Sequence, residues 1–265
     1  MLACEATSSA LNTAAIEPKS GSLLLCGGID TKLSLYDINA IRSKKENAKL
    51  IRPNREFSGH RSLITSCGFL SPEYFISGSR DSTINLWELE QQRSINKFDD
   101  HQDEVVALDI FEMDRNIFAS GSADLTFRIW DIRMKRACFR IFDKNKCGVS
   151  TIRFMPENVN TLAVGYEDAS IKIWDLRALG KISKMTDKAF FESVVSMEFS
   201  KSGRLLFSAY NNTVVKVWDL LTATKISEFA GNIHGDVLKS ISLAENGCSL
   251  ISTGKDGLIA KWDLS

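Results

Sequence analysis

The chain has 265 residues, of which 44% are hydrophobic, and its 33 basic side chains balance its 33 acidic ones. A chain of this length buries roughly 70 to 75% of its unfolded surface, which is enough for a stable core. The balanced charge excludes a global attraction to nucleic acid or to acidic membranes. The absence of any run of eighteen apolar residues predicts no membrane span. Because the Ala-rich start carries Glu5 and lacks a basic end, a cytoplasmic location is expected.

Six similar segments follow one another along the chain. The first, CGGIDTKLSLYD, ends in Tyr36 and Asp37, and the later ones carry every tryptophan of the chain, 43 or 44 residues apart: Trp87, Trp130, Trp174, Trp218 and Trp262. An acid or amide stands six residues before each aromatic residue: Asp30, Asp81, Asp124, Asp168, Asn212 and Asp256. One structural unit is therefore written six times.

Each unit holds strands. After a turn, polar and apolar residues alternate, as from Thr126 to Trp130, which predicts a strand packed on one face only. The third period contains four such runs, at 94–98, 105–111, 116–120 and 126–132. Four antiparallel strands in about 40 to 45 residues are typical of a propeller blade. We therefore predict an all-β propeller forming one domain over residues 1–265, with repeats ending near Asp37, Glu88, Asp131, Asp175, Asp219 and Asp263.

The Gly-His and Trp-Asp pairs resemble those of WD-repeat proteins, and the three histidines of the chain stand in the family's His slot. The resemblance implies hydrogen bonds that join this His to the turn Asp and, through a Ser, to the Trp ring nitrogen. Three complete sets are expected: His60, Ser77, Asp81 and Trp87; His101, Ser120, Asp124 and Trp130; His234, Ser252, Asp256 and Trp262. Repeats one, four and five depart from the set and are expected to be held more by packing, with Cys26 and Val164 in the Ser slot and Asn145 and roughly Asp187 in the His slot.

Several stretches resemble the beta subunits of heterotrimeric G proteins in particular. They are 18–21 followed by 26–30, 57–60 followed by 67–70, and 200–206. The wider spacing from Tyr36 to Trp87 also matches that family's extended loop. On this resemblance, residues 10–265 correspond to the last six of seven repeats. Because residues 1–20 contain no heptad, the family's N-terminal coiled-coil helix has no counterpart, and binding of a gamma subunit is doubtful. The chain then fits either a divergent short member or an incomplete copy.

The last copy stops after its third expected strand, so its outer strand must come from elsewhere. Leu2 to Ser8 could supply it and close a ring of six blades. The alternative is an incomplete seven-blade arrangement, which is slightly favoured because inherited packing between blades sets the rotation per repeat.

The resemblance implies a protein-interaction function in signal transduction, with a G-protein alpha subunit as the candidate partner at the inner face of the plasma membrane. Carried over by position, the alpha-contacting residues are Asn12, Ile29, Thr31, Arg61, Leu63, Glu104, Val106, Gly148, Glu167 and Lys255. The family has aromatic anchors where this chain has Leu63 and Lys255, so a more acidic partner is a second candidate for Arg61 and Lys255. The alternative function is a general WD-repeat scaffold, such as a ubiquitin-ligase receptor or a ribosome-associated propeller, which binds effector or scaffold proteins but no alpha subunit.

Catalysis is not predicted. The Ser, His and Asp residues recur at blade spacing together with a Trp, whereas a nucleophilic site should occur once. The His, Cys and carboxylate residues do not fall at metal-ligand spacing, and the six cysteines are interpreted as small reduced core residues. We therefore expect no cofactor and no metal.

Overall fold

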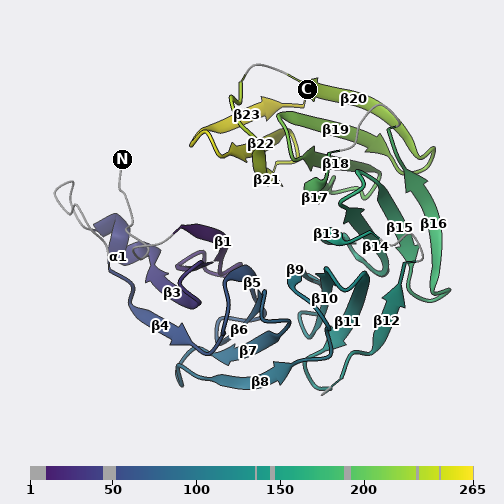
Figure 1. Cartoon of the computed structure of the whole chain (residues 1–265). Helices are drawn as coiled ribbons and strands as arrows, with labels where there is room; N and C mark the ends of the chain where they lie inside the picture. The colour runs from purple at the N-terminus through teal and green to yellow at the C-terminus, as the bar shows by residue number, and fades with distance from the viewer. Residues whose placement is uncertain are drawn as a thin grey trace. The chain divides into compact units, whose positions relative to one another are not determined.

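The computed structural model describes residues 10–43, 52–134, 136–143, 147–187, 192–230, 233–244 and 246–264. Within these ranges the chain forms strands β1 to β23 and a single short helix, α1 (Ile38–Ser43). The strands make antiparallel sheets, each in the sequential order of a propeller blade (Figure 1). The predicted all-β propeller fold with six repeats is therefore confirmed.

The sheets are numbered here as blades 1 to 6 in chain order. Their strands are β1 (Leu11–Ile16), β2 (Leu23–Gly28), β3 (Lys32–Asp37) and β4 (Arg55–Ser58) in blade 1; β5 (Ile64–Phe69), β6 (Tyr74–Ser79), β7 (Ile84–Glu88) and β8 (Ser94–Phe98) in blade 2; β9 (Val105–Ile110), β10 (Ile117–Ser122), β11 (Thr126–Asp131) and β12 (Phe139–Phe142) in blade 3; β13 (Val149–Met155), β14 (Asn158–Tyr166), β15 (Ile171–Asp175) and β16 (Gly180–Met185) in blade 4; β17 (Val194–Phe199), β18 (Leu205–Tyr210), β19 (Val214–Asp219) and β20 (Thr224–Ala230) in blade 5; and β21 (Leu238–Leu243), β22 (Ser249–Gly254) and β23 (Ile259–Asp263) in blade 6.

The chain divides into two compact units. The first holds blades 1 and 2 and most of blade 3, and the second holds blades 4 to 6 together with residues 111–113, 125–127 and 141 onward. The assignment of residues 1–265 to one domain therefore stays a prediction. We describe each unit by itself.

The turn before each third strand explains the recurrent acid. The residue after the acid adopts a left-handed backbone at Thr31, Ser82, Leu125, Ala169 and Gly257. Two residues after the acid, a backbone N–H donates to its side chain, as from Thr83 to Asp81 Oδ1 (3.1 Å) and from Leu258 to Asp256 Oδ1 (3.0 Å). This is the turn chemistry that Asp and Asn side chains favour, so the acid sets the direction in which the third strand begins.

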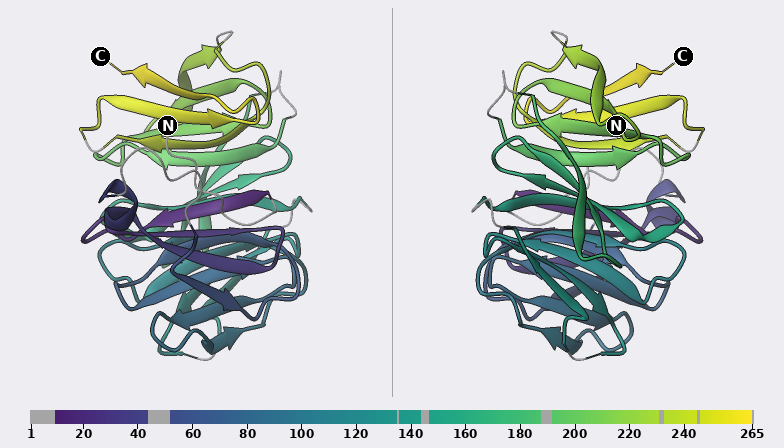
Figure 2. Two further views of the ribbon diagram at one scale, coloured as in Figure 1. Left: turned by 90° about the vertical axis from the view of Figure 1, so that its left-hand side faces the viewer. Right: turned by 90° about the vertical axis from the view of Figure 1, so that its right-hand side faces the viewer.

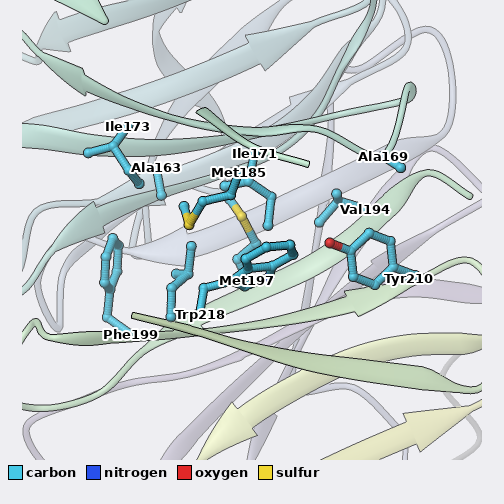
Figure 3. Packing of buried hydrophobic residues seen from close by; sticks show 11 residues of the cluster. Ala163, Ala169, Ile171, Ile173, Met185, Val194, Met197, Phe199, Tyr210 and Trp218 are labelled. Atoms are coloured by element: carbon cyan, nitrogen blue, oxygen red, sulfur yellow. The ribbon is translucent and has the colours of Figure 1, made fainter. Parts of the chain in front are cut away.

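The third strands of blades 1 to 5 are largely buried on both faces, and the prediction of packing on one face only was wrong for them, whereas β23 of blade 6 is mostly exposed. Lys172 on β15 is 1% exposed and Lys216 on β19 is 0% exposed. The cause is stacking of adjacent blades within a unit. Phe57 of blade 1, for example, lies 5.9 Å from the Trp87 ring of blade 2, centroid to centroid. Figure 3 shows the equivalent cluster between blades 4 and 5, in which Ile171 and Met185 meet Met197 and Trp218.

Blade 6 has three strands in the part of the chain that the structure describes, and β23 forms the edge of its sheet (Figure 2). Leu2 to Ser8, the segment predicted to supply a fourth strand, lies outside the described residues. The choice between a closed six-blade ring and an incomplete seven-blade arrangement therefore stays a prediction. Among the described residues, no helix has the length and apolar character needed to cross a membrane.

Candidate partner-binding site

A buried hydrogen-bond chain crosses blade 2 from its core to a loop. The Trp87 Nε1–H donates to Ser77 Oγ (2.8 Å), and Ser77 Oγ lies 2.7 Å from His60 Nε2. The other ring nitrogen, Nδ1, lies 3.0 Å from Asp81 Oδ2. If the His60 proton is on Nδ1, each donor in this hydrogen-bond series has one acceptor: Trp87 donates to Ser77, Ser77 to His60 Nε2, and His60 Nδ1–H to Asp81.

The structure brings together the same four residue types in blades 3 and 6. In blade 3, His101 lies 2.6 Å from Ser120 Oγ and 2.9 Å from Asp124, and the Trp130 Nε1–H donates to Ser120 Oγ (2.8 Å). In blade 6, His234 lies 2.8 Å from Ser252 Oγ and 3.0 Å from Asp256, and the Trp262 Nε1–H donates to Ser252 Oγ (2.9 Å). Blade 5 keeps part of the chain, since the Trp218 Nε1–H donates to Ser208 Oγ (2.8 Å).

The turn acid also holds the first residue of the loop that follows the His. The backbone N–H of Arg61 donates to Asp81 Oδ2 (2.8 Å), and Gln102 and Gly235 make the same bond to Asp124 (3.1 Å) and Asp256 (2.9 Å). Burial alone would raise the pKa of Asp81, but the hydrogen bonds from His60, Thr83 and Arg61 outweigh it and lower the pKa. The loop residue is thus fixed by the fold through its backbone.

Blades 4 and 5 contain a buried ion pair that the sequence interpretation missed. The Lys172 ammonium pairs with Asp143 and lies 4.4 Å from the centroid of the Tyr166 ring. In blade 5, Lys216 Nζ lies 3.0 Å from Asp187 Oδ2 and 4.8 Å from the Tyr210 ring centroid. An ion pair and a cation–π contact thus take the place of the His chain in these blades, and the expectation that they are held more by packing stays a prediction.

Asn145, which the sequence assigns to the His slot of blade 4, lies outside the described residues, so that assignment stays a prediction. The acid that pairs with Lys172 in blade 4 is Asp143. Asp187 fills the corresponding place in blade 5. The sequence did contain a signal for these ion pairs. Only the repeats of blades 4 and 5 have a Lys two residues before the Trp, and the same two repeats have a Tyr eight residues before it. Blades 2 and 3 have Ser79 and Ser122 at that second position.

Seven of the ten candidate alpha-contacting residues belong to the first unit. Ile29 and Thr31 lie in the β2–β3 turn, and Ile29 is 53% exposed. Arg61 and Leu63 lie in the β4–β5 link, where the Leu63 carbonyl accepts the backbone N–H of Arg80 (3.1 Å). These positions combine an exposed apolar side chain with an exposed guanidinium, as protein-binding surfaces do.

The other three of these seven are partly engaged by the protein itself. The Asn12 amide donates to the Ile64 carbonyl (3.2 Å), and Val106 is half-buried on β9. Glu104 forms an ion pair with Arg80 (3.1 Å). The acid expected from the resemblance is therefore present, but Arg80 holds it in place.

The remaining three candidates belong to the second unit. Lys255, in the β22–β23 turn, and Glu167, in the β14–β15 turn, are exposed. A side chain added at Gly148 would meet the Glu167 carboxylate at 2.8 to 3.0 Å. The Glu167 carboxylate thus occupies the space beside the Gly148 backbone. The second unit keeps a carboxylate at this place, supplied by a neighbouring turn.

The pH dependence of stability should report on the blade 3 chain. Burial lowers the pKa of His101, although Asp124 acts in the opposite direction. The folded protein therefore favours neutral His101. Its contribution to the free energy of unfolding is fully present above pH about 6.5 and is lost as the pH falls below that value. When the pH is lowered from 7.5 to 5.0, the free energy of unfolding measured in urea should fall less for His101→Gln than for the wild type. Equal losses would contradict a neutral His101, and since His60 and His234 are common to both proteins, the difference isolates this residue.

Sequence comparisons agree with a repeated blade of this construction. The profile described as "WD domain, G-beta repeat" matches residues 51–88, 92–131, 136–175 and 186–219. Together with the six blades, these matches define a WD-repeat propeller. Because they cover more than half of its length, the chain belongs to the WD40 family.

Curated relatives include beta subunits of guanine nucleotide-binding proteins. The chain is 32% identical over 103 residues to subunit beta-1 of Drosophila melanogaster and of Caenorhabditis briggsae, which covers 39% of this chain and 28% of each relative. It is 32% identical over 111 residues to the beta subunit of Dictyostelium discoideum, which covers 42% of this chain and 30% of that relative. The matched stretch thus spans less than a third of the relatives' length.

Proposed function

We propose that this chain is a non-catalytic, protein-binding propeller that takes a G-protein alpha subunit as its partner in signal transduction. The repeat family and the distant similarity to beta subunits support a protein-interaction scaffold. The observation that carries the proposal is the loop of blade 2, in which Asp81 fixes the backbone of Arg61. The exposed Ile29 follows β2, a strand that contacts β5 at the end of this loop.

Preorganisation of these loops favours a specific partner. The His60 chain fixes the entry to the β4–β5 link, and the bond from Arg80 to Leu63 fixes its end. A partner then meets side chains whose backbone is already ordered, which reduces the entropy lost on binding. The ion pair between Arg80 and Glu104 adds a carboxylate at a defined place on the same unit.

Binding to an alpha subunit tests the proposal. The purified chain should capture a GDP-loaded alpha subunit more strongly than the activated form in a biolayer interferometry assay. Ile29→Asp should weaken capture about tenfold, because it places a charge in an apolar contact. The matched control is Ile95→Asp, since Ile95 is 42% exposed on the outer strand β8, away from the candidate residues.

Equal capture of both nucleotide forms, or equal effects of the two substitutions, would contradict this assignment. It would favour the second candidate, a general scaffold for an acidic partner, for which the exposed side chains of Arg61 and Lys255 are the supporting observation. Under the first proposal the protein acts in the cytoplasm and reaches the inner face of the plasma membrane through its partner. A gamma subunit forms no part of the proposal.

A further inference from the structure

The outer strand of blade 4 carries two ammonium groups on one face. β16 lies at the end of its sheet, and Lys181 and Lys184 are both exposed on it. Lys181 stands opposite Trp174, and Lys184 stands opposite Lys172, two residues before Trp174 on β15. Residues two apart in a strand share a face, and the extra residue that interrupts the ladder here brings both lysines to that face. The strand therefore presents a pair of positive charges on one side.

Blade 5 has the same arrangement with one charge reversed. Its outer strand places Lys225 opposite Trp218 and Glu228 opposite Lys216, and its ladder is irregular at the same place. Lys225 Nζ lies 2.9 Å from Glu228 Oε2 and 2.9 Å from Asp187 Oδ2. Side chains at these two positions of an outer strand thus reach each other, and the lysine takes up a carboxylate.

Blade 4 lacks this acid. Lys184 occupies the position that Glu228 has in blade 5. In the part of the chain that the structure describes, neither Lys181 nor Lys184 forms an ion pair, and no acid stands between Asp175 and Asp187 in the sequence. Like charges on one face of a sheet repel, so a carboxylate supplied by another molecule would relieve the repulsion.

Apolar side chains border the two lysines. Ile182, which stands between them in the sequence, is 60% exposed, and Leu179, in the turn before β16, is 54% exposed. Leu179 also has a left-handed backbone with φ 48°, at the turn position where blades 2 and 5 have Gln92 and Ala223. This conformation disfavours a bulky side chain, and the exposure shows that packing does not offset the cost. The Leu179 side chain is therefore available for contact with a partner.

We propose that this face of β16 binds a segment of a partner protein that combines acidic and apolar residues. A partner carboxylate lies between Lys181 and Lys184, in the place that Glu228 has in blade 5, and apolar side chains contact Leu179 and Ile182. Lysines on an edge strand discourage pairing with a further strand, so the contacts are made by side chains. The surface shares no residue with the candidate alpha-contacting set, and the proposal does not depend on alpha-subunit binding.

The test uses a labelled heptapeptide of alternating glutamate and leucine. Fluorescence anisotropy should show saturable binding to the full chain, and glutamine in place of glutamate should weaken it at least about tenfold. Lys184→Glu should weaken binding equally, because it gives blade 4 the ion pair of blade 5. Lys239→Glu is the matched control, since Lys239 is exposed on the inner strand β21 and the charge change is the same. It should bind within about twofold of the wild type, and both variants should melt like the wild type.

Leu179→Gly separates contact with a partner from a structural role. Glycine removes the apolar side chain and adopts the left-handed backbone without strain. The variant should therefore bind the peptide about threefold more weakly and melt no lower than the wild type. Unchanged binding with a lower melting temperature would assign Leu179 to the fold and contradict the proposal.

Three further results would overturn the proposal. The first is an absence of saturable peptide binding. The second is equal weakening by Lys184→Glu and Lys239→Glu, which would show a response to net charge and not to this face. The third is binding of the wild type to vesicles of phosphatidylcholine and phosphatidylserine that Lys184→Glu abolishes and the peptide does not compete, which would assign the face to an anionic lipid surface. None of these results bears on capture of an alpha subunit, so the two proposals fail separately.

Discussion

Asp143→Ala is expected to lower the free energy of unfolding by about 3 to 5 kcal/mol, the cost of leaving a buried charge without its partner. Lys172 is 1% exposed, and its ammonium pairs with Asp143 over the Tyr166 ring. The aromatic ring cannot replace the carboxylate, because a cation–π contact contributes only about 0.5 to 2 kcal/mol. Urea unfolding followed by circular dichroism measures the loss.

A double variant separates the ion pair from simple loss of packing. Asp143→Ala combined with Lys172→Met removes both charges and should recover most of the stability, because replacing a buried pair with apolar groups is often neutral. Lys184→Ala is the matched surface control, since Lys184 is exposed on β16 directly opposite Lys172 and should change stability by less than about 0.5 kcal/mol. If the double variant is as unstable as Asp143→Ala, charge burial is not the cause.

Asp124→Ala is the second large effect, with an expected loss of about 3 kcal/mol or more. The substitution removes the acceptor of His101 Nδ1 and of the Gln102 N–H. It also removes the acid 3.6 Å from the buried Arg128 guanidinium. Each stranded neutral donor costs about 1 to 3 kcal/mol, and the buried Arg128 guanidinium is left with Asp100, 3.7 Å away, as its acid partner.

The matched control for Asp124 is the turn acid of a blade without a His. Asp168 occupies the same slot in blade 4 and accepts hydrogen bonds from the backbone and side chain of Ser170. Asp168→Ala should therefore cost only about 1 kcal/mol, measured in the same urea titration. Similar losses for the two variants would show that the turn, and not the His chain, accounts for the effect.

The repeat could be recognised in the sequence because its signals are local and recur. A turn acid, an alternating strand and a Trp at constant spacing follow from the chemistry of one turn and one strand, and six copies reinforce one another. The positions of His60, His101 and His234 relative to those signals identified the atoms that the structure brings together.

The buried cations were not predictable by the same reasoning. Alternation assigns Arg128, Lys172 and Lys216 to a solvent-facing side, since period alone does not reveal that a neighbouring blade covers the second face. The contacts of the candidate site were hidden for a similar reason. The pairing of Arg80 with Glu104, and the placement of Glu167 over Gly148, join residues from different turns, and their side-chain directions depend on the folded backbone.

The hydrogen bond from the loop backbone to the turn acid involves the backbone N–H that the fold requires, and it leaves the side chain of the same residue available for contact with a partner. Arg61, Gln102 and Gly235 make this bond with side chains that have nothing in common. Any amino acid except proline can donate the same N–H. Recognition can therefore diverge at these three places by single substitutions at little cost in folding, which allows one scaffold to acquire new binding preferences.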